Sequence, residues 1–476
     1  MLDPLDWFGF AAFVVALLAV GATRARRPQD YLVAGRRVGL FALVPTLVMT
    51  EFNTTTLLAF SGFGYRVGPM AVGLSAVFLV GLGWYTLTVA RRWKRFDRLS
   101  VAELFTERYG RGVGRFASAL LIVAMVGFSA TYVKSLTLIF SPWAGGLDPW
   151  VLSLGLTGVA VGMTIRGGLL SVVRTDVLGF CVTLVVIPAL LGVAVYRHGG
   201  FADLATAFPP EQLTVAPVAQ WNSPALPYWF VTSLVVLTCF TYISSPWYGQ
   251  KVFAAGSERV AVLAVGIAAV LVFALYASAQ LAAAFLRVEV SGLAAPETAL
   301  PVMVGLWLPP FVRGVVYATL LVAAVTTLTG VWSAMVAMAV ADFAPVGLAG
   351  VGRQRGATAA AAVLSWLGAN LLVDDILNRL ILANVPIAAL SFALLAGFYW
   401  PRANTTGAWV SITVGVGWGA GCYLYFGEAG GYTWYWAVYG IPLVFASGVA
   451  GSLLAPRRGP GNDPGSAAPA APVRDE

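Results

Sequence analysis

The sequence predicts an all-α membrane protein with about thirteen transmembrane helices. Of its 476 residues, 59% are hydrophobic and only 11% are charged, whereas a soluble domain carries about 25% charged residues. Apolar runs of about 18 residues or more, each long enough to cross the hydrocarbon core of a bilayer, recur along the chain. These runs lie near residues 5–22, 39–63, 69–90, 114–140, 149–165, 175–196, 226–248, 258–286, 311–341, 357–373, 378–399, 406–426 and 433–455.

The order of the runs predicts one transmembrane domain, residues 1–455, followed by a short tail. The first run has no basic segment before it and no small-residue cleavage site after it, so we interpret residues 5–22 as a retained helix. The last residues, 456–476, are rich in Pro, Gly and Ala, and we expect them to form a disordered cytoplasmic tail.

The positive charges predict how the chain is oriented in the membrane. If the N-terminus is outside, most of the 29 Lys and Arg residues fall in inner segments, Lys251 after the run 226–248 among them. We therefore expect a multi-pass protein of the plasma membrane with its C-terminus in the cytoplasm. The net charge of +8 then reflects topology rather than an affinity for nucleic acid.

Residues typical of catalysis are sparse. The single histidine, His198, lies in a polar connection, and Cys181, Cys239 and Cys422 lie inside apolar runs, so no Ser/His/Asp or Cys/His arrangement is evident. The sequence also lacks the GxxxxGK[ST] loop of nucleotide-driven pumps. We expect neither an enzyme nor an obligatory protein partner, and we expect the lipid bilayer and a small-molecule solute as partners.

One apolar run is interrupted by the stretch MTEFNTTT, residues 49–56. Within it, Glu51, Asn53 and the three threonines at 54–56 place a carboxylate, an amide and three hydroxyls where the bilayer would be deepest, and lipid cannot satisfy such groups. A run of β-branched and polar residues also favours a helix that breaks, and broken helices bind solutes and ions in transporters. The alternative is a polar patch that only forms hydrogen bonds with neighbouring helices.

Seven short stretches follow one another in a characteristic order. They are DYLVAGRRVG at 30–39, TTTLLAFSGFGYRVG at 54–68, ELFTERYG at 103–110, RGGLLSVVRTD at 166–176, GQKVFAAGSERVA at 249–261, a long segment at 299–330 and GFYWPRANTTGA at 397–408. Together they resemble the sodium:solute symporter family. The resemblance implies a LeuT-like 5+5 inverted repeat, with the extra N-terminal helix 5–22, core repeats at about 39–196 and 226–399, and peripheral C-terminal helices at 406–455.

The resemblance also implies a sodium site between the first and eighth core helices. Its ligands would be the carbonyl oxygens of Met49, Phe52 and Ala323 with the hydroxyls of Thr326 and Thr327, and oxygen atoms are what a hard cation prefers. The alternative for the two hydroxyls is a hydrogen bond back to their own helix. Asp176 and Thr329 match a possible second ion site, but Gly330 replaces a hydroxyl residue there, so we expect one sodium ion per solute.

The solute contacts implied by the family fall on four core helices. One of them, Lys134, lies deep in an apolar run, where an unpaired ammonium is costly. It should therefore meet Glu51, a solute carboxylate or an aqueous vestibule, unless it extends to the outer surface. The full set is Glu51, Asn53, Thr56, Ser75, Lys134, Thr238 and Thr241.

These features predict a sodium-coupled symporter that imports a small polar organic solute by alternating access. A facing carboxylate and amine suit an amino acid, or a small carboxylate if Glu51 is protonated or otherwise engaged. One alternative is a proton-coupled carrier that uses Glu51. Another is a sensor, derived from a transporter, that binds its solute without moving it.

Overall fold

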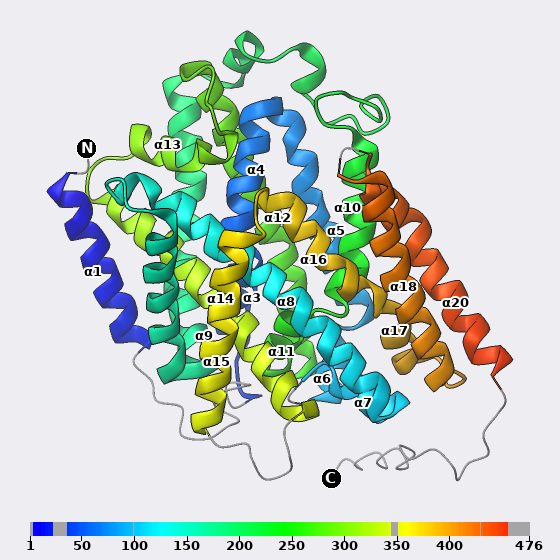
Figure 1. The fold of residues 1–476 in the computed structure, drawn as a ribbon. Helices are drawn as coiled ribbons and strands as arrows, with labels where there is room; N and C mark the ends of the chain where they lie inside the picture. Colours follow the sequence, from blue (N-terminus) through cyan, green and yellow to red (C-terminus); the bar gives the residue numbers. More distant parts are fainter. Residues whose placement is uncertain (1–2, 22–35, 99, 344–350, 429, 456–476) are drawn as a thin grey trace.

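The computed structural model describes residues 3–21, 36–98, 100–343, 351–428 and 430–455. Helices make up most of this part of the chain, and its β-structure is limited to an isolated parallel bridge between Val38 and Ala255. The expected tail 456–476 and the start of the DYLVAGRRVG stretch lie outside the described residues. The helices stand side by side in one bundle (Figure 1).

Seven helical segments of the described chain are long and apolar enough to cross a membrane, or eight if one bent pair counts as a single crossing. Shorter apolar helices accompany them, among them α1 (Pro4–Gly21) and α3 (Leu40–Glu51). Each expected apolar run coincides with helix, because a backbone in lipid must satisfy its own hydrogen bonds. The fold class expected from the sequence is therefore confirmed as all-helical.

Two expected crossings, 149–165 and 175–196, belong to one helix, α9 (Pro149–Arg197), of 49 residues. Its second apolar stretch, Val172–Arg197, is long and apolar enough to cross a membrane, whereas the first, Pro149–Gly162, is a shorter apolar helix. The sequence does not show that helix continues between the two runs.

Two spans are broken in the middle. The first breaks between α3 and α4 (Thr54–Val67), where Phe52 and Asn53 leave the helix. The second bends by 49° between α10 (Tyr228–Tyr242) and α11 (Pro246–Phe253). Pro246 occupies the first turn of α11, where the N–H that it lacks would have no partner in the helix. The same proline cannot continue α10, because it lacks an N–H to donate and its ring clashes with the preceding turn.

Helix α14 (Val312–Phe343) occupies the centre of the bundle, and its most apolar stretch is entirely buried. It packs against α1, α9, α8 (Arg111–Phe140) and α15 (Val351–Leu371). Figure 1 shows α1 at one edge of the bundle and the C-terminal helices at the opposite edge.

Helix α12 (Glu258–Glu289) packs along α3, α4 and α5 (Val72–Thr88), so one long helix supports both halves of the first broken span. The remaining helices are α6 (Ala90–Phe96), α7 (Glu103–Tyr109), α13 (Ala299–Trp307), α16 (Ile376–Ala389), α17 (Ser391–Tyr399), α18 (Thr405–Phe426), α19 (Tyr432–Trp434) and α20 (Ile441–Leu454), with short 3₁₀ turns between some of them and a π-helical turn at Tyr435–Gly440.

Candidate ion and solute site at the broken helices

A cavity of about 90 Å³ lies where the two broken spans meet α5, α8 and α16. A water needs about 15 Å³ by this measure, so the cavity has room for on the order of six waters or a small solute. Its apolar wall includes Phe60, Phe78, Phe128 and Tyr132. The polar residues of the wall are Glu51, Asn53, Thr56, Thr238, Thr241, Tyr242, Ser245, Trp247 and Asn384.

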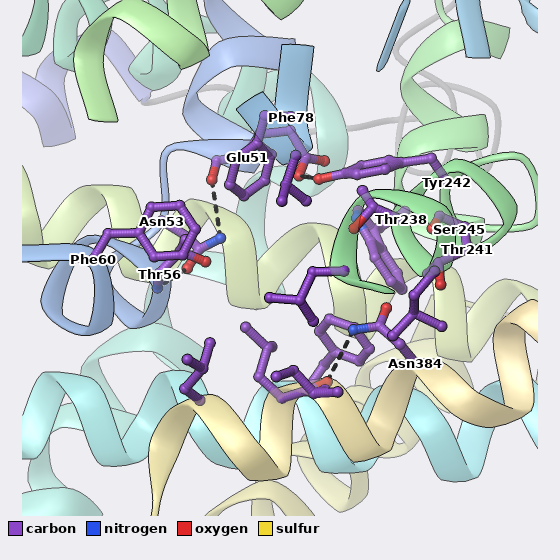
Figure 2. A pocket seen from close by; sticks show the side chains of 18 of the residues that line it. Glu51, Asn53, Thr56, Phe60, Phe78, Thr238, Thr241, Tyr242, Ser245 and Asn384 are labelled. Atoms are coloured by element: carbon purple, nitrogen blue, oxygen red, sulfur yellow. Dashed lines mark hydrogen bonds between the residues drawn. The ribbon is translucent and has the colours of Figure 1, made fainter. Parts of the chain in front are cut away.

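Five of the expected solute contacts are in this wall: Glu51, Asn53, Thr56, Thr238 and Thr241. Figure 2 shows Glu51 and Tyr242 pointing toward each other, with Asn384 on α16 at the opposite side of the cavity. Side chains from both broken spans therefore converge on one buried space.

Glu51 ends α3 and is 4% exposed. The Tyr242 hydroxyl donates to its Oε2. Its Oε1 is buried and has no hydrogen-bond partner among the described residues. A buried acceptor without a partner is costly, so this oxygen is available to a hydrogen-bond donor that enters the cavity.

Asn53 is the N-cap of α4, and its side chain bonds to backbone groups on both sides of the break. Its Oδ1 accepts from the Thr56 N–H over 2.9 Å, and its Nδ2 donates to the Glu51 carbonyl over 3.0 Å. In an unbroken helix the Thr56 N–H would bond to the carbonyl of Phe52. The cap thus leaves that carbonyl oxygen free of its usual helical donor.

The same break releases the carbonyl of Met49. Its helical donor would be the Asn53 N–H, which instead donates to the Glu51 carbonyl over 2.9 Å and to the Tyr276 hydroxyl over 3.2 Å. The Tyr276 hydroxyl in turn donates to the Glu51 carbonyl over 2.5 Å. Two of the expected sodium ligands are therefore the carbonyls that the break sets free.

The remaining expected ligands lie opposite on α14. The hydroxyls of Thr326 and Thr327 donate to the Ala323 carbonyl over 3.2 and 2.7 Å, so both form the bond to their own helix that was the alternative interpretation. Thr327 also reaches α3, since its Oγ1 lies 3.4 Å from the Met49 carbonyl oxygen. All five residues are at least 97% buried, and carbonyl and hydroxyl oxygens are the ligands that a small hard cation prefers.

Two other hydroxyls of the MTEFNTTT stretch face away from the cavity. Thr54 and Thr55 lie 2.8 and 3.2 Å from the Ser135 hydroxyl on α8. For these two residues the alternative of a polar patch between helices is the better description. They fasten α4 to α8, whereas Thr56 lines the cavity.

Ser75 and Lys134 are expected solute contacts that lie outside the cavity wall. Ser75 donates to the Gln280 Oε1 over 2.5 Å and so joins α5 to α12. Lys134 is partly exposed, two residues beyond Tyr132, which does line the cavity. Since successive residues of a helix are rotated by about 100°, Lys134 points to a different face of α8.

The expected second ion site is divided between two sets of contacts. The Thr329 hydroxyl lies 2.7 Å from that of Thr164, whereas Asp176 accepts from Thr46 over 2.5 Å and from Lys251 over 3.1 Å. Lys251 was expected in an inner connection but is 1% exposed, because the broken span continues through α11 to Phe253.

Several wall residues were not expected from the sequence, among them Tyr242, Ser245, Trp247 and Asn384. A signal for the first three was present. The stretch Ser244-Ser245-Pro246 interrupts an apolar run with helix-breaking residues, as MTEFNTTT does. Asn384 had no comparable signal, because a single amide in an apolar helix does not show which face it occupies.

An all-helical bundle with two broken spans around one buried polar cavity defines a membrane transporter. The chain belongs to the sodium:solute symporter family, whose model matches residues 31–415. The resemblance in the seven stretches is thereby confirmed.

Curated relatives of the chain are transporters. It is 25% identical over 429 residues to the sodium/pantothenate symporter of Escherichia coli (strain K12), which covers 84% of this chain and 86% of the relative. The corresponding symporter of Haemophilus influenzae is 23% identical over 430 residues, 86% of this chain and 87% of the relative. The sodium/glucose cotransporter of Vibrio parahaemolyticus matches 37% of this chain at 24% identity.

Solved structures share the fold. A sodium-coupled sialic acid symporter, solved in a substrate-bound outward-open state, superposes with a TM-score of 0.81 at 18% identity, covering 95% of this chain and 98% of that chain. A nucleobase-cation-symport-1 family transporter superposes with a TM-score of 0.57 at 14% identity, covering 88% of this chain. The expectation of a transporter rather than an enzyme agrees with these relatives.

Proposed function

We propose that this protein is a sodium-coupled symporter of the plasma membrane that imports a small polar organic solute by alternating access. The proposal rests on the family, on the cavity between the broken spans and on the oxygen ligands beside it. We further propose thirteen crossings, an outer N-terminus and a cytoplasmic C-terminus, with α1 outside the two core repeats. The inner concentration of positive charge supports this orientation.

For sodium we propose the carbonyl oxygens of Met49, Phe52 and Ala323 with the hydroxyls of Thr326 and Thr327. The carbonyls of Met49 and Phe52 lack their helical donors, and an ion would replace those donors. Bound sodium would join α3 to α14 beside the cavity. We expect one sodium ion per solute.

For the solute, the observation that carries the proposal is the buried, unpartnered Oε1 of Glu51. Glu51 is the charged residue of the described cavity wall, and Lys134 is not there to balance it. A solute that brings an ammonium group would satisfy this oxygen and neutralise the charge. Of the two expected solute classes, this favours an amino acid over a simple carboxylate.

A solute carboxylate has a separate position available at the start of α4. The first N–H groups of a helix have no acceptor in the helix, and a broken helix directs this positive end at anionic solute groups. Thr54 begins α4 directly after Asn53, which lines the cavity. Pantothenate and sialic acid, named for two relatives, both carry a carboxylate, and this position would receive such a group.

Sodium binding and solute binding would be coupled because both ligands would contact the same short stretch, residues 49–53. Met49 and Phe52 would hold sodium, and Glu51 and Asn53 would hold solute. Ordering the break around one ligand therefore prepares it for the other, and the coupling must be reciprocal. Sodium would favour solute binding, and solute would tighten sodium.

A proton-coupled carrier is the second candidate, favoured by the burial of Glu51 beside a tyrosine hydroxyl rather than a cation. In that mechanism Glu51 would carry a proton in place of sodium.

Uptake into proteoliposomes distinguishes these candidates. A panel of radiolabelled amino acids and small carboxylates is supplied with an inward sodium gradient, with an inward proton gradient, or with neither. The variant is Thr327→Ala. The control is Thr319→Ala, another buried threonine of α14, whose hydroxyl donates to the Val315 carbonyl over 2.8 Å.

We expect sodium-driven uptake of an amino acid. A hydrogen bond to a charged group is worth about 1.5–3 kcal/mol, and we expect one oxygen ligand of the ion to contribute a similar amount. Thr327→Ala should therefore weaken apparent sodium affinity by about tenfold or more, and Thr319→Ala should not. Uptake that depends on the proton gradient and not on sodium would instead favour the proton-coupled carrier, with Glu51 as the group that carries the proton.

A further inference from the structure

Lys251 is a fully buried cation that the solute cavity does not use. It lies in α11 with a side chain 2% exposed, although its position in the sequence suggests a solvated connection. Burying an ammonium without compensating oxygens would be prohibitive. The surroundings of its Nζ therefore show what kind of site this part of the bundle forms.

Three oxygens surround the Nζ, and each comes from a side chain or carbonyl that would also suit a small cation. The Thr46 carbonyl oxygen lies at 2.9 Å and the Asp176 Oδ2 at 3.1 Å, and the Thr50 hydroxyl accepts from the same nitrogen. A carboxylate, a carbonyl and a hydroxyl are the ligands that hard cations take in proteins.

The carboxylate at the centre of this group requires a cation. Asp176 is completely buried on α9, and its Oδ1 has no hydrogen-bond partner among the described residues. Its Oδ2 accepts from the Thr46 hydroxyl over 2.5 Å as well as from Lys251. The one ion pair that the structure gives Asp176 is with Lys251. Removal of the lysine would leave a buried, uncompensated negative charge.

We propose that the Lys251 ammonium is a tethered cation that occupies a monovalent-cation site formed by Thr46, Thr50 and Asp176. A free ion cannot enter while the ammonium is there. In this chain the site is therefore closed to sodium, and the proposed sodium site beside Met49 supplies the coupling ion. The conclusion that one sodium ion accompanies each solute rests on the proposed function.

The site joins the two broken spans. Thr46 and Thr50 lie on α3, Lys251 on α11 and Asp176 on α9, so the ammonium crosslinks three helices. Thr50 stands between Met49 and Glu51, the residues proposed for sodium and for solute. A fixed charge at this point provides, without an ion from solution, the attraction that a second sodium would otherwise supply.

The test is the number of sodium ions bound per chain at saturation, measured with radiolabelled sodium on purified protein in nanodiscs at pH 8. Lys251→Met removes the charge and keeps an apolar stem of similar length. Lys251→Met combined with Asp176→Asn also removes the carboxylate. Lys94→Met is the matched control, because Lys94 is also mostly buried, with Nζ 3.0 Å from the Phe253 carbonyl and 3.2 Å from Asp97.

We expect Lys251→Met to bind one more sodium ion per chain than the wild type, an increase of about twofold if the wild type binds one. The double variant and Lys94→Met should bind the wild-type number. If Lys251→Met does not yield monodisperse protein, Lys251→Gln, which keeps N–H donors for Thr46 and Thr50, should show the same gain.

An unchanged number in a folded, monodisperse Lys251 variant would overturn the proposal, because Asp176 would then be neutralised by a proton. A gain that persists in the double variant would also overturn it, since the new ion would not lie at Asp176. A wild type that binds no sodium would refute the proposed coupling ion instead, and the difference between wild type and variant would still test the tethered cation.

Discussion

The hydroxyl of Tyr276 and the backbone carbonyl of Glu51 are 2.5 Å apart, and this hydrogen bond ties α12 to the break in the first span. The same hydroxyl accepts the Asn53 N–H over 3.2 Å. The Tyr276 ring packs against Phe52 and Phe60, with centroids 4.8 and 5.2 Å away. One side chain from a neighbouring helix thus adds a donor and an acceptor for two backbone groups at the break.

Tyr276→Phe should destabilise the break while keeping the ring in place. The variant loses two hydrogen bonds, each worth about 0.5–1.5 kcal/mol, so we expect a lower thermal midpoint and weaker solute binding. Tyr65→Phe is the control, because its hydroxyl also bonds a carbonyl and an N–H, at Val290 and Leu293, outside the cavity wall. Equal loss of solute affinity in both variants would contradict a specific role for Tyr276.

Gly64→Ala should separate α4 from α12. A Cβ at this position would lie 2.2 Å from the Gln280 carbonyl oxygen, so the helices must move apart. Overpacking of this kind costs about 1–3 kcal/mol, which thermal unfolding would detect. Gly83→Ala, on α5 with no atom within 4 Å of its Cβ, should leave the midpoint unchanged or raise it. A tolerated Gly64→Ala would mean that the close approach of the two helices is not required.

Glu51→Gln should abolish or strongly reduce uptake of a solute that carries an ammonium group. The amide keeps the shape and can accept from Tyr242, but it removes the negative charge, and a hydrogen bond to a charged group is worth about 1.5–3 kcal/mol. We therefore expect solute affinity to fall by at least about tenfold. Glu107→Gln, in an exposed ion pair with Arg98, is the control. Full uptake by the Glu51 variant would remove the residue from solute recognition.

Lys134→Ala should leave uptake near the wild-type rate, because Lys134 lies outside the cavity wall. This expectation reverses the one that follows from the family resemblance alone, which places its ammonium beside the solute. Initial rates of sodium-driven uptake, normalised to protein reconstituted, decide between them. A variant that is folded and inactive would show that Lys134 reaches the solute in another state of the cycle.

The helices could be predicted from the sequence because each apolar run must satisfy its own backbone in lipid. The break at MTEFNTTT was predictable for the same reason, since a buried carboxylate and amide have no place in an unbroken lipid-facing helix. The second break was missed because Ser244, Ser245 and Pro246 interrupt their apolar run only a few residues before its end, where they resemble the end of a span.

The faces of the helices were harder to predict than the helices themselves. Thr55 and Thr56 are adjacent and chemically identical, yet one bonds Ser135 and the other lines the cavity. A rotation of about 100° per residue separates these roles, and only the neighbouring helices determine which face is which. Lys251 could not be assigned because its partner, Asp176, is 75 residues away in the sequence.

The contact between α1 and α14 has a consequence for how the protein is made. Asp6 on α1 is completely buried and pairs with Arg313, 307 residues later in the chain. Gly314 lies so close to α1 that a Cβ there would be 1.9 Å from the Asp6 carbonyl oxygen. At about 5–20 residues per second, a ribosome reaches Arg313 about 15–60 s after Asp6. During synthesis, the Asp6 carboxylate is therefore without its ion-pair partner until α14 has been made.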